Sequence, residues 1–202
     1  MGKVAENKQQ KEQNLLDTAF ELFTTKGFAK TSIADIVERA GMAKGTFYLY
    51  FRDKYDIQEK LIVRKAGQVF HHALSHLDFS RCASFADRLI AIADDALEQL
   101  QKDPGLLRFI NKNLSWGIFR RALHKSSDDY LGTFERILAD SGEQIEEPVL
   151  LLYTILELVS STCHSVILEK DPVDLERYKP YLYRSIRAIV ESFRVKAEEK
   201  TE

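Results

Sequence analysis

A chain of 202 residues with 45% hydrophobic and 30% charged residues has a folded, globular composition, enough for one large domain or a small domain joined to a medium one. The 29 basic and 31 acidic residues give a net charge of −2. This balance excludes a protein that holds nucleic acid by bulk positive charge. Any contact with DNA must therefore be local.

The cysteines and the apolar runs indicate a reducing compartment. Cys82 and Cys163 have no CxxC spacing and form no disulfide framework. The N-terminus has no apolar signal core, and the longest apolar run, residues 149–159, is interrupted by Thr154 and Glu157 and is too short to span a bilayer. We therefore expect a cytoplasmic protein with no membrane partner.

The N-terminal residues predict short helices separated by glycines. The polar stretch 1–11 is either a frayed tail or the first turns of a helix that ends at Gly27. Ser32 and Asp35 resemble a capping box at the start of a second helix, and Gly41 ends that helix.

A third helix, at about residues 44–51, is only two turns long and needs its neighbours to persist. Phe47 and Phe51, four residues apart, should face the core. No acidic residue occurs from Arg39 to Arg52. The pattern is that of a helix-turn-helix, whose second helix lies in the major groove of DNA.

The outward residues of this segment suit DNA contact in different ways. Cations suit phosphate or guanine, hydroxyls suit phosphate oxygens, aromatic rings offer a flat face, glycine allows close approach, and an apolar side chain can pack on a thymine methyl. The cations are Lys44 and Lys54, the hydroxyls are Thr31 and Thr46, and the aromatic rings are Tyr48 and Tyr50. The glycine is Gly45 and the apolar side chain is Leu49.

The run Ala-Gly-Met-Ala-Lys-Gly-Thr-Phe-Tyr-Leu-Tyr-Phe-Arg-Asp-Lys at residues 40–54, with Gly27, Phe28 and residues 31–36 before it, resembles the DNA-binding domain of TetR-family transcriptional regulators. The similarity covers about residues 11–61. One departure is Ala43, where the family often has Ser or Thr as the helix cap; losing that cap costs about 1 kcal/mol. The family's DNA contacts fall on Thr31, Ser32, Lys44, Gly45, Thr46, Tyr48, Leu49, Tyr50 and Lys54.

The resemblance implies an all-α architecture of nine helices. Three helices would form a DNA-binding domain at residues 1–53, and a fourth, at residues 54–77 and capped by Asp53, would link it to the rest. Residues 54–202 would form an effector-binding and dimerisation domain, with the last two helices making a homodimer.

The later helices are separated by helix-breaking stretches at residues 78–81, 103–105, 125–129, 140–148 and 169–172. Asp103 before Pro104, and Asp171 before Pro172, predict two helix caps, each followed by a first-turn proline. We expect the last helix to start or kink at Pro180. These breaks leave five helices after the fourth.

The eighth predicted helix, counted from the N-terminus and lying at about residues 147–169, is apolar around most of its circumference. A helix of this kind needs burial on all sides. The core can cover one face, and a second subunit can cover the other.

The candidate effector pocket is predicted from apolar and aromatic residues at helical spacing, with a few polar groups to orient a small apolar or amphipathic ligand. An ordinary core has the same pattern. The candidates are His71, Phe85, Leu89, Trp116, Tyr130, Phe134, Tyr153 and His164.

Two pairs of side chains raise the possibility of a metal site or a catalytic site. His72 and His76 have the spacing of two ligands on one helix face, but no third ligand is evident, Asp78 being the nearest candidate. Solvent-facing or pocket-lining histidines are the alternative, and we expect no metal and no cofactor. Cys163 and His164 are sequence neighbours, so they point apart and cannot form a nucleophilic pair.

Together these patterns predict a homodimeric, ligand-responsive transcriptional repressor that binds a palindromic operator in double-stranded DNA. Two alternatives stay open. One is a constitutive DNA-binding regulator without an effector, and the other is an enzyme on a helical scaffold.

Overall fold

The computed structural model describes residues 3–111, 117 and 130–195. In this part of the chain all regular structure is helical, apart from one isolated antiparallel bridge between Ile145 and Arg194, so the all-α prediction is confirmed. The nine described α-helices are α1 (Lys3–Leu22), α2 (Ile33–Arg39), α3 (Lys44–Tyr48), α4 (Lys54–His76), α5 (Phe85–Lys102), α6 (Pro104–Asn111), α8 (Tyr130–Ala139), α9 (Pro148–His164) and α10 (Leu175–Ser192). Short helical turns are η1 (Phe23–Gly27), η2 (Phe79–Arg81) and η3 (Ser165–Glu169).

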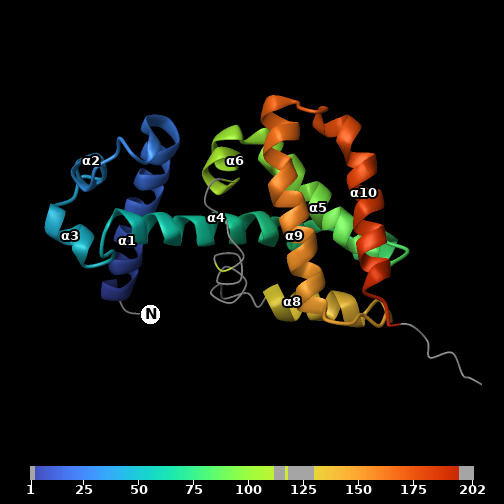
Figure 1. Ribbon diagram of the computed structural model, residues 1–202. Coiled ribbons are helices and arrows are strands. Elements are labelled where there is room, and N and C mark those ends of the chain that lie inside the picture. The colour runs from blue at the N-terminus through green and yellow to red at the C-terminus, as the bar shows by residue number, and fades with distance from the viewer. Residues whose placement is uncertain (1–2, 112–116, 118–129, 196–202) are drawn as a thin grey trace, which may run out of the picture.

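The helices form two units joined by α4 (Figure 1). The N-terminal unit consists of α1, η1, α2 and α3, and the C-terminal bundle consists of α5, α6, α8, α9 and α10. Helix α4 has 23 residues and is therefore about 34 Å long. It starts against the N-terminal unit and ends inside the C-terminal bundle, so it belongs to both.

The N-terminal unit is built from the local signals expected. The polar start of the chain belongs to α1 from Lys3 onward, and Gly27 leaves the helix with a φ of +89°, a conformation that glycine adopts readily. The capping box is present: the Asp35 amide donates to Ser32 Oγ at 3.1 Å, and the Ser32 amide donates to Asp35 Oδ2 at 2.7 Å. Lys26 also binds Asp35, at 2.8 Å.

The Asp35 carboxyl is strongly acidic in this setting. The hydrogen bond from Lys26, followed by those from the Ser32 backbone and side chain, lowers the pKa of Asp35 to about 2. The carboxylate is therefore ionised at any physiological pH, and its charge lies favourably near the N-terminus of α2.

Helix α4 begins where the sequence predicts. Asp53 Oδ1 accepts hydrogen bonds from the amides of Tyr55 and Asp56, both at 2.8 Å. Ile57 and Leu61 follow on the face that packs in the core, and both are fully buried. The cap and the buried stripe together set the direction in which α4 leaves the N-terminal unit.

Two expectations about the end of the chain were wrong. Helix α10 is capped by Asp174, which accepts from the Arg177 amide at 2.9 Å, and not by Asp171. The reason is that the Asp171 amide still bonds to the Ser165 carbonyl at 3.3 Å, so the turn has not yet ended. Pro180 lies inside α10, so of the two alternatives expected there, a start or a kink, the start was wrong. The first turn of α10 is secured by burial of Leu175.

Helix α9 and η3 form one apolar segment, Pro148–Glu169. Its 22 residues make it, among the described helices, the one whose length and composition would suit a membrane span, so the expectation of a run too short to span was wrong. The helix simply continues through Thr154 and Glu157. One face of this segment nevertheless packs in the protein core, where Leu151, Leu152 and Ile155 are buried.

Candidate DNA-binding surface and effector cavity

Helix α3 presents two opposite faces. Phe47 and Phe51 are buried, with ring centroids 5.4 Å apart, and the amides of Tyr50 and Phe51 bond to the Phe47 carbonyl at 3.0 Å, so the helical turn continues beyond Tyr48. On the other face Tyr48 is 53% and Leu49 is 75% exposed. A leucine exposed to this degree is unusual unless a partner covers it.

Lys44 lies in the segment from Arg39 to Arg52, which contains no acidic residue, and its charge is available to bind DNA phosphate. The flanking arginines are engaged, since Arg39 pairs with Glu21 and Arg52 pairs with Asp56. Lys44 is exposed and has no ion-pair partner within the described residues. Ala43, at the N-cap of α3, gives no side-chain hydrogen bond, as its sequence predicts.

The residues beside Lys44 differ in exposure. Gly45 and Ser32 are exposed, whereas Thr46 and Tyr50 are half-buried and Tyr50 packs against the core. A Cβ atom added at Gly45 would meet nothing within 4 Å. No packing inside the chain therefore requires glycine at this position.

Two of the expected contacts have internal roles instead. Thr31 is only 2% exposed, and its hydroxyl donates to the Gly27 carbonyl at 2.9 Å. The Lys54 ammonium donates to the carbonyls of Phe28 and Thr31, at 2.8 and 2.9 Å, and lies 4.3 Å from the centroid of the Phe28 ring. Both side chains were expected to reach phosphate, but here they hold the loop between η1 and α2.

A second lysine of α4, Lys60, makes the same two kinds of contact with residues just after the end of α3. Lys60 donates to the Tyr50 carbonyl at 2.9 Å and lies 4.6 Å from the centroid of the Phe51 ring. Together with Lys54 it attaches the first two turns of α4 to the N-terminal unit. These contacts join the helix-turn-helix and the start of α4 into one rigid unit.

The C-terminal bundle forms a partly open apolar cavity at the far half of α4. Its volume is about 130 Å³, roughly ten times the space one water molecule needs, so it is larger than a packing defect. It is lined by residues of α4, α5, α6, α8 and α9: Ala66, Val69, Phe70, Leu89, Ile92, Ala93, Ala96, Leu100, Leu107, Ile110, Phe134, Leu152, Ile155, Leu156, Val159, Ser160 and Cys163.

The polar side chains of this lining, Ser160 and Cys163, are uncharged. Burial raises the pKa of the Cys163 thiol to about 11, so it is protonated at neutral pH. Its Sγ lies 3.3 Å from the Ser160 carbonyl. The described residues that line the cavity therefore include no ionised group, and this lining suits a hydrocarbon.

A protein-family model described as bacterial regulatory proteins, tetR family, matches residues 15–61. The match runs from α1 through both helices of the motif to the buried Leu61 of α4. The matched residues form a DNA-binding domain of the TetR family. The chain is accordingly a DNA-binding transcriptional regulator, of a type in which ligand response and dimerisation are typical.

Relatives within the TetR family are similar beyond this segment. The fatty acid metabolism regulator protein of Bacillus subtilis is 28% identical over 144 residues, which are 67% of this chain and 72% of the relative. The regulator YvdT of Bacillus subtilis is 42% identical over 67 residues, 33% of this chain and 32% of that protein.

Solved structures share the same fold along nearly the whole chain. A TetR-family regulator from Shewanella sp. PV-4 has a TM-score of 0.65 at 22% identity, covering 92% of this chain and 99% of the other. FadR from Bacillus subtilis, in complex with stearoyl-CoA, has a TM-score of 0.61 at 21% identity, covering 90% of this chain and 98% of the other. These likenesses extend the TetR fold to the C-terminal bundle.

The residues expected in a TetR-type effector pocket are only partly brought together. Leu89 and Phe134 line the cavity, while Phe85 is buried beside Phe134, with ring centroids 5.8 Å apart, but does not line it. Trp116 and the side chain of Tyr130 lie outside the described residues.

The expected polar groups lie elsewhere. His71 and Tyr153 are exposed, and His164 lies 3.7 Å from Glu169, so none of the three lines the cavity. The polar groups that do, Ser160 and Cys163, were missed. A signal for them was present, because residues 152, 155, 156, 159, 160 and 163 recur at helical spacing on one face of α9.

Proposed function

We propose that this TetR-family chain is a homodimeric repressor that an effector with a long apolar chain releases from a palindromic operator in the cytoplasm. The supporting observation is the position of α4. Lys54 and Lys60 attach its start to the helix-turn-helix, and Ala66, Val69 and Phe70 of the same helix line the cavity. The domain division is then residues 1–53 for DNA and 54–202 for effector and dimer.

The DNA contacts we propose are the outward residues of α3 and the cap of α2. Lys44 offers an unpaired ammonium, and Tyr48 and Leu49 offer exposed faces for the major groove. Glycine at position 45 costs a helix about 1 kcal/mol relative to alanine, and its use without an internal steric reason favours close approach by the DNA backbone. Ser32, Thr46 and Tyr50 complete the set, whereas Thr31 and Lys54 act by holding the loop.

The effector we propose carries a fatty acyl chain. The apolar lining offers such a chain burial without leaving buried charges unpaired. The names of two relatives point the same way, a fatty acid metabolism regulator and a FadR structure that holds stearoyl-CoA. The neutral Cys163 thiol and the uncharged character of the described lining residues also favour ligand binding over catalysis.

Release would follow from movement of α4. A ligand that fits one arrangement of the bundle better than another shifts the protein toward that arrangement. Because α4 both lines the cavity and carries the helix-turn-helix, its displacement changes the separation of the two recognition helices in a dimer. Twofold half-sites lie about 34–36 Å apart, so a changed separation weakens binding.

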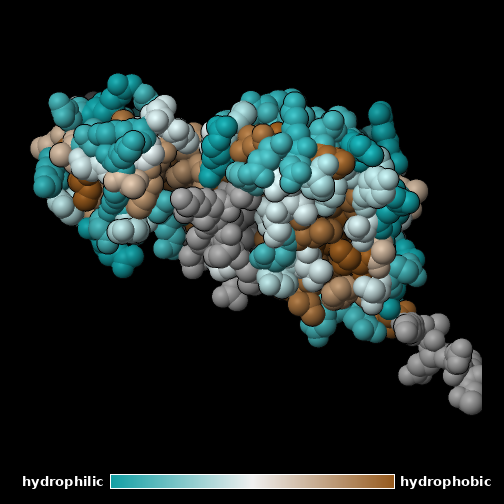
Figure 2. All heavy atoms as spheres, turned by 45° about the horizontal axis from the view of Figure 1, so that its top comes forward, coloured by the Kyte–Doolittle hydropathy of each residue, from teal (hydrophilic) through white to brown (hydrophobic). Residues whose placement is uncertain are grey.

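The dimer would form through α9 and α10. Only 28% of the most apolar window of Pro148–Glu169 is buried within one chain. Val149, Leu150 and Tyr153 of α9 and Tyr181 of α10 are exposed. Figure 2 shows hydrophobic atoms gathered on the larger unit, in the part of the view where α9 and α10 lie. A second copy would cover these side chains in an isologous interface.

The proposal is tested by operator binding in the presence of acyl-CoA thioesters of increasing chain length. Fluorescence anisotropy with labelled DNA from the gene's own promoter should show tight binding that long-chain thioesters release and free coenzyme A does not. Ala96→Phe, which fills the cavity, should keep DNA binding and require at least tenfold more thioester for release.

The matched control is Ala91→Phe on the same helix, since Ala91 is half-buried like Ala96 but does not line the cavity. It should respond as the wild type does. Binding that no thioester changes would leave the constitutive regulator as the better reading. Equal responses of the two variants would remove the cavity as the effector site.

A further inference from the structure

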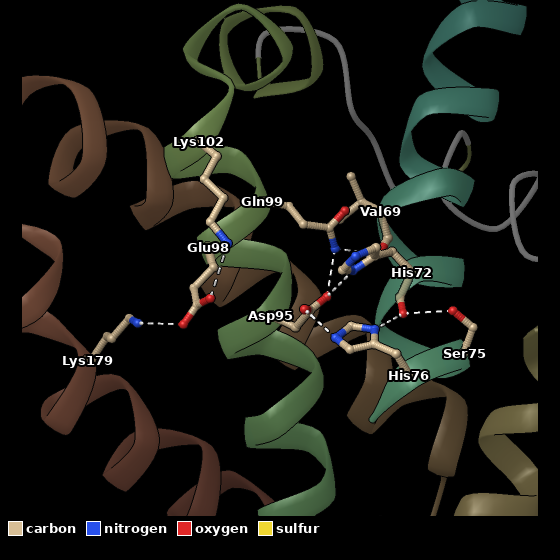
Figure 3. Close-up of polar contacts among 9 residues, drawn as sticks. All are labelled: Val69, His72, Ser75, His76, Asp95, Glu98, Gln99, Lys102 and Lys179. Carbon is tan, nitrogen blue, oxygen red and sulfur yellow. Dashed lines mark hydrogen bonds and ion pairs between the residues drawn. The ribbon is translucent and has the colours of Figure 1, made fainter. Parts of the chain in front are cut away.

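Three side chains outside the cavity converge between α4 and α5 (Figure 3). His72 Nδ1 lies 3.1 Å from Asp95 Oδ2, and His76 Nε2 lies 3.2 Å from Asp95 Oδ1. One nitrogen of each ring and a carboxylate oxygen all lie within 4.8 Å of one another. In a tetrahedral zinc site with bonds of about 2.0–2.1 Å, ligand atoms are about 3.4 Å apart. The spacing therefore needs only small side-chain adjustments to enclose an ion.

The tautomer of His76 places a lone pair on the side of the carboxylate. Its Nδ1 makes a short contact with the backbone carbonyl of His72, which can only accept, so Nδ1 carries the hydrogen. In the neutral ring Nε2 is then an acceptor, yet it faces an oxygen of Asp95. Two acceptors at this separation repel one another unless a proton or a metal ion lies between them.

The groups around the cluster already hold it in place. The Gln99 side-chain amide donates to Asp95 Oδ2 at 2.7 Å and to the Val69 carbonyl at 3.0 Å. Metal-binding histidines commonly donate their second ring N–H to a backbone carbonyl, as His76 does here, and metal-binding carboxylates are themselves hydrogen-bonded. Both supporting contacts of a metal site are thus present.

We propose that His72, His76 and Asp95 bind a divalent transition-metal ion such as Zn²⁺. Two imidazoles and one carboxylate suit zinc and its neighbours, whereas magnesium and calcium prefer oxygen ligands. The histidine side chains are 56% and 48% exposed, which leaves water access to the remaining coordination position. Asp95, at 11%, is the inner ligand.

The third ligand is therefore not Asp78, the candidate nearest in sequence. Asp95 comes from α5, nineteen residues beyond His76, and only the packing of α5 on α4 brings it close. A bound ion would bridge these two helices just beyond the cavity-lining residues Val69 and Phe70. It would fix the last turns of α4 to the bundle.

The test uses the full-length protein, freed of metal with a chelator and titrated with ZnCl₂ by calorimetry. We expect one saturable site per chain and a melting temperature that rises with zinc, because an ion that binds only the folded state stabilises it. His76→Gln should weaken binding at least tenfold and lose the rise in melting temperature. His71→Gln, an exposed neighbour outside the cluster, should keep both.

A measurement on the wild type keeps the test decisive if His76→Gln does not fold. Long-range ¹H–¹⁵N spectra should show His72 Nδ1 and His76 Nε2 shifting with zinc, while the ring nitrogens of His71 do not. Rings bridged to Asp95 by a proton alone would give no saturable zinc binding, and that result overturns the proposal. So would equal affinities for His76→Gln and His71→Gln. Neither readout involves DNA or effector, so failure here leaves the proposed function untouched.

Discussion

The N-terminal unit and the C-terminal bundle use exposed side chains differently. In the N-terminal unit the inward residues Phe47 and Phe51 are separated from exposed Tyr48 and Leu49 within one short helix. In the C-terminal bundle a single helix, α9, serves the core, the cavity and the exposed surface at once. The proposed DNA contacts therefore rest on individual side chains of the first unit, whereas the proposed cavity and dimer surface rest on whole helix faces of the second.

The difference arises from how each unit is specified. A DNA groove has fixed dimensions and chemistry, so the residues that enter it must have particular types at particular spacings. An apolar cavity only needs side chains that leave room and carry no charge. This is consistent with the family model's match being confined to residues 15–61.

The largest expected effect is loss of operator binding on changing the exposed face of α3. Lys44→Ala and Tyr48→Ala should each weaken operator binding by about 1–3 kcal/mol per half-site, and a twofold dimer has two half-sites. Lys44→Ala should also reduce the dependence of affinity on salt, because it removes a phosphate contact. Anisotropy titrations at several salt concentrations measure both quantities.

Lys102→Ala is the control for Lys44→Ala, because Lys102 is an exposed lysine on α5 in the C-terminal bundle. It should leave operator affinity unchanged. Wild-type affinity in both α3 variants would remove the assignment of that face to DNA and with it the comparison drawn above.

A smaller effect separates two lysines that the sequence motif treats alike. Lys54→Met removes the donor to two backbone carbonyls and should lower the free energy of unfolding by about 1–3 kcal/mol. Lys44→Met, at an exposed position, should change it by less than about 0.5 kcal/mol. Urea denaturation of the dimer at fixed protein concentration provides the values. Similar losses in both variants would contradict the internal role of Lys54.

The smallest effect concerns acid and the capping box of α2. The folded pKa of Asp35 is about 2, below an unfolded value of about 3.9. A lowered folded pKa stabilises the protein above the unfolded value, and this contribution is lost as pH falls from about 4 to about 2. Lys26→Met should raise the Asp35 pKa, measured by NMR titration of its side-chain carboxyl carbon.

Lys30→Met is the control for Lys26→Met, since it removes a nearby exposed lysine without touching the capping box. The Asp35 titration should then match that of the wild type. A pKa near 4 in the unmodified protein would show that the contact from Lys26 does not persist in solution.

Local signals were enough to predict much of the fold. The Ser32–Asp35 capping box, the Asp53 cap of α4 and the inward face of Phe47 each depend on residues within a few positions of one another. Asp103 also caps α6 as expected, accepting from the Leu106 amide at 2.9 Å. In each case the partner is fixed by helix geometry, so spacing alone identifies it.

Contacts between distant segments could not be predicted from the sequence. Lys54 reaches the Phe28 carbonyl 26 residues away, and Asp95 meets His76 across a helix interface. Spacing says nothing about either pair, so it predicts neither the internal partner of Lys54 nor a third ligand for the histidine pair. The polar residues of the cavity were misplaced for the same reason, because apolar periodicity marks burial without distinguishing a cavity wall from solid core.

Helix α9 both lines the cavity and carries exposed apolar side chains, and these two roles restrict how its sequence can change. Leu152, Ile155 and Val159 shape the cavity, while Val149 and Leu150, on the same helix, are exposed. A substitution that enlarges the ligand space also shifts the outer surface, because both rows share one backbone. New effector specificities should therefore arise more readily on α5, whose Ala93 and Ala96 can change size without altering the proposed contact between subunits.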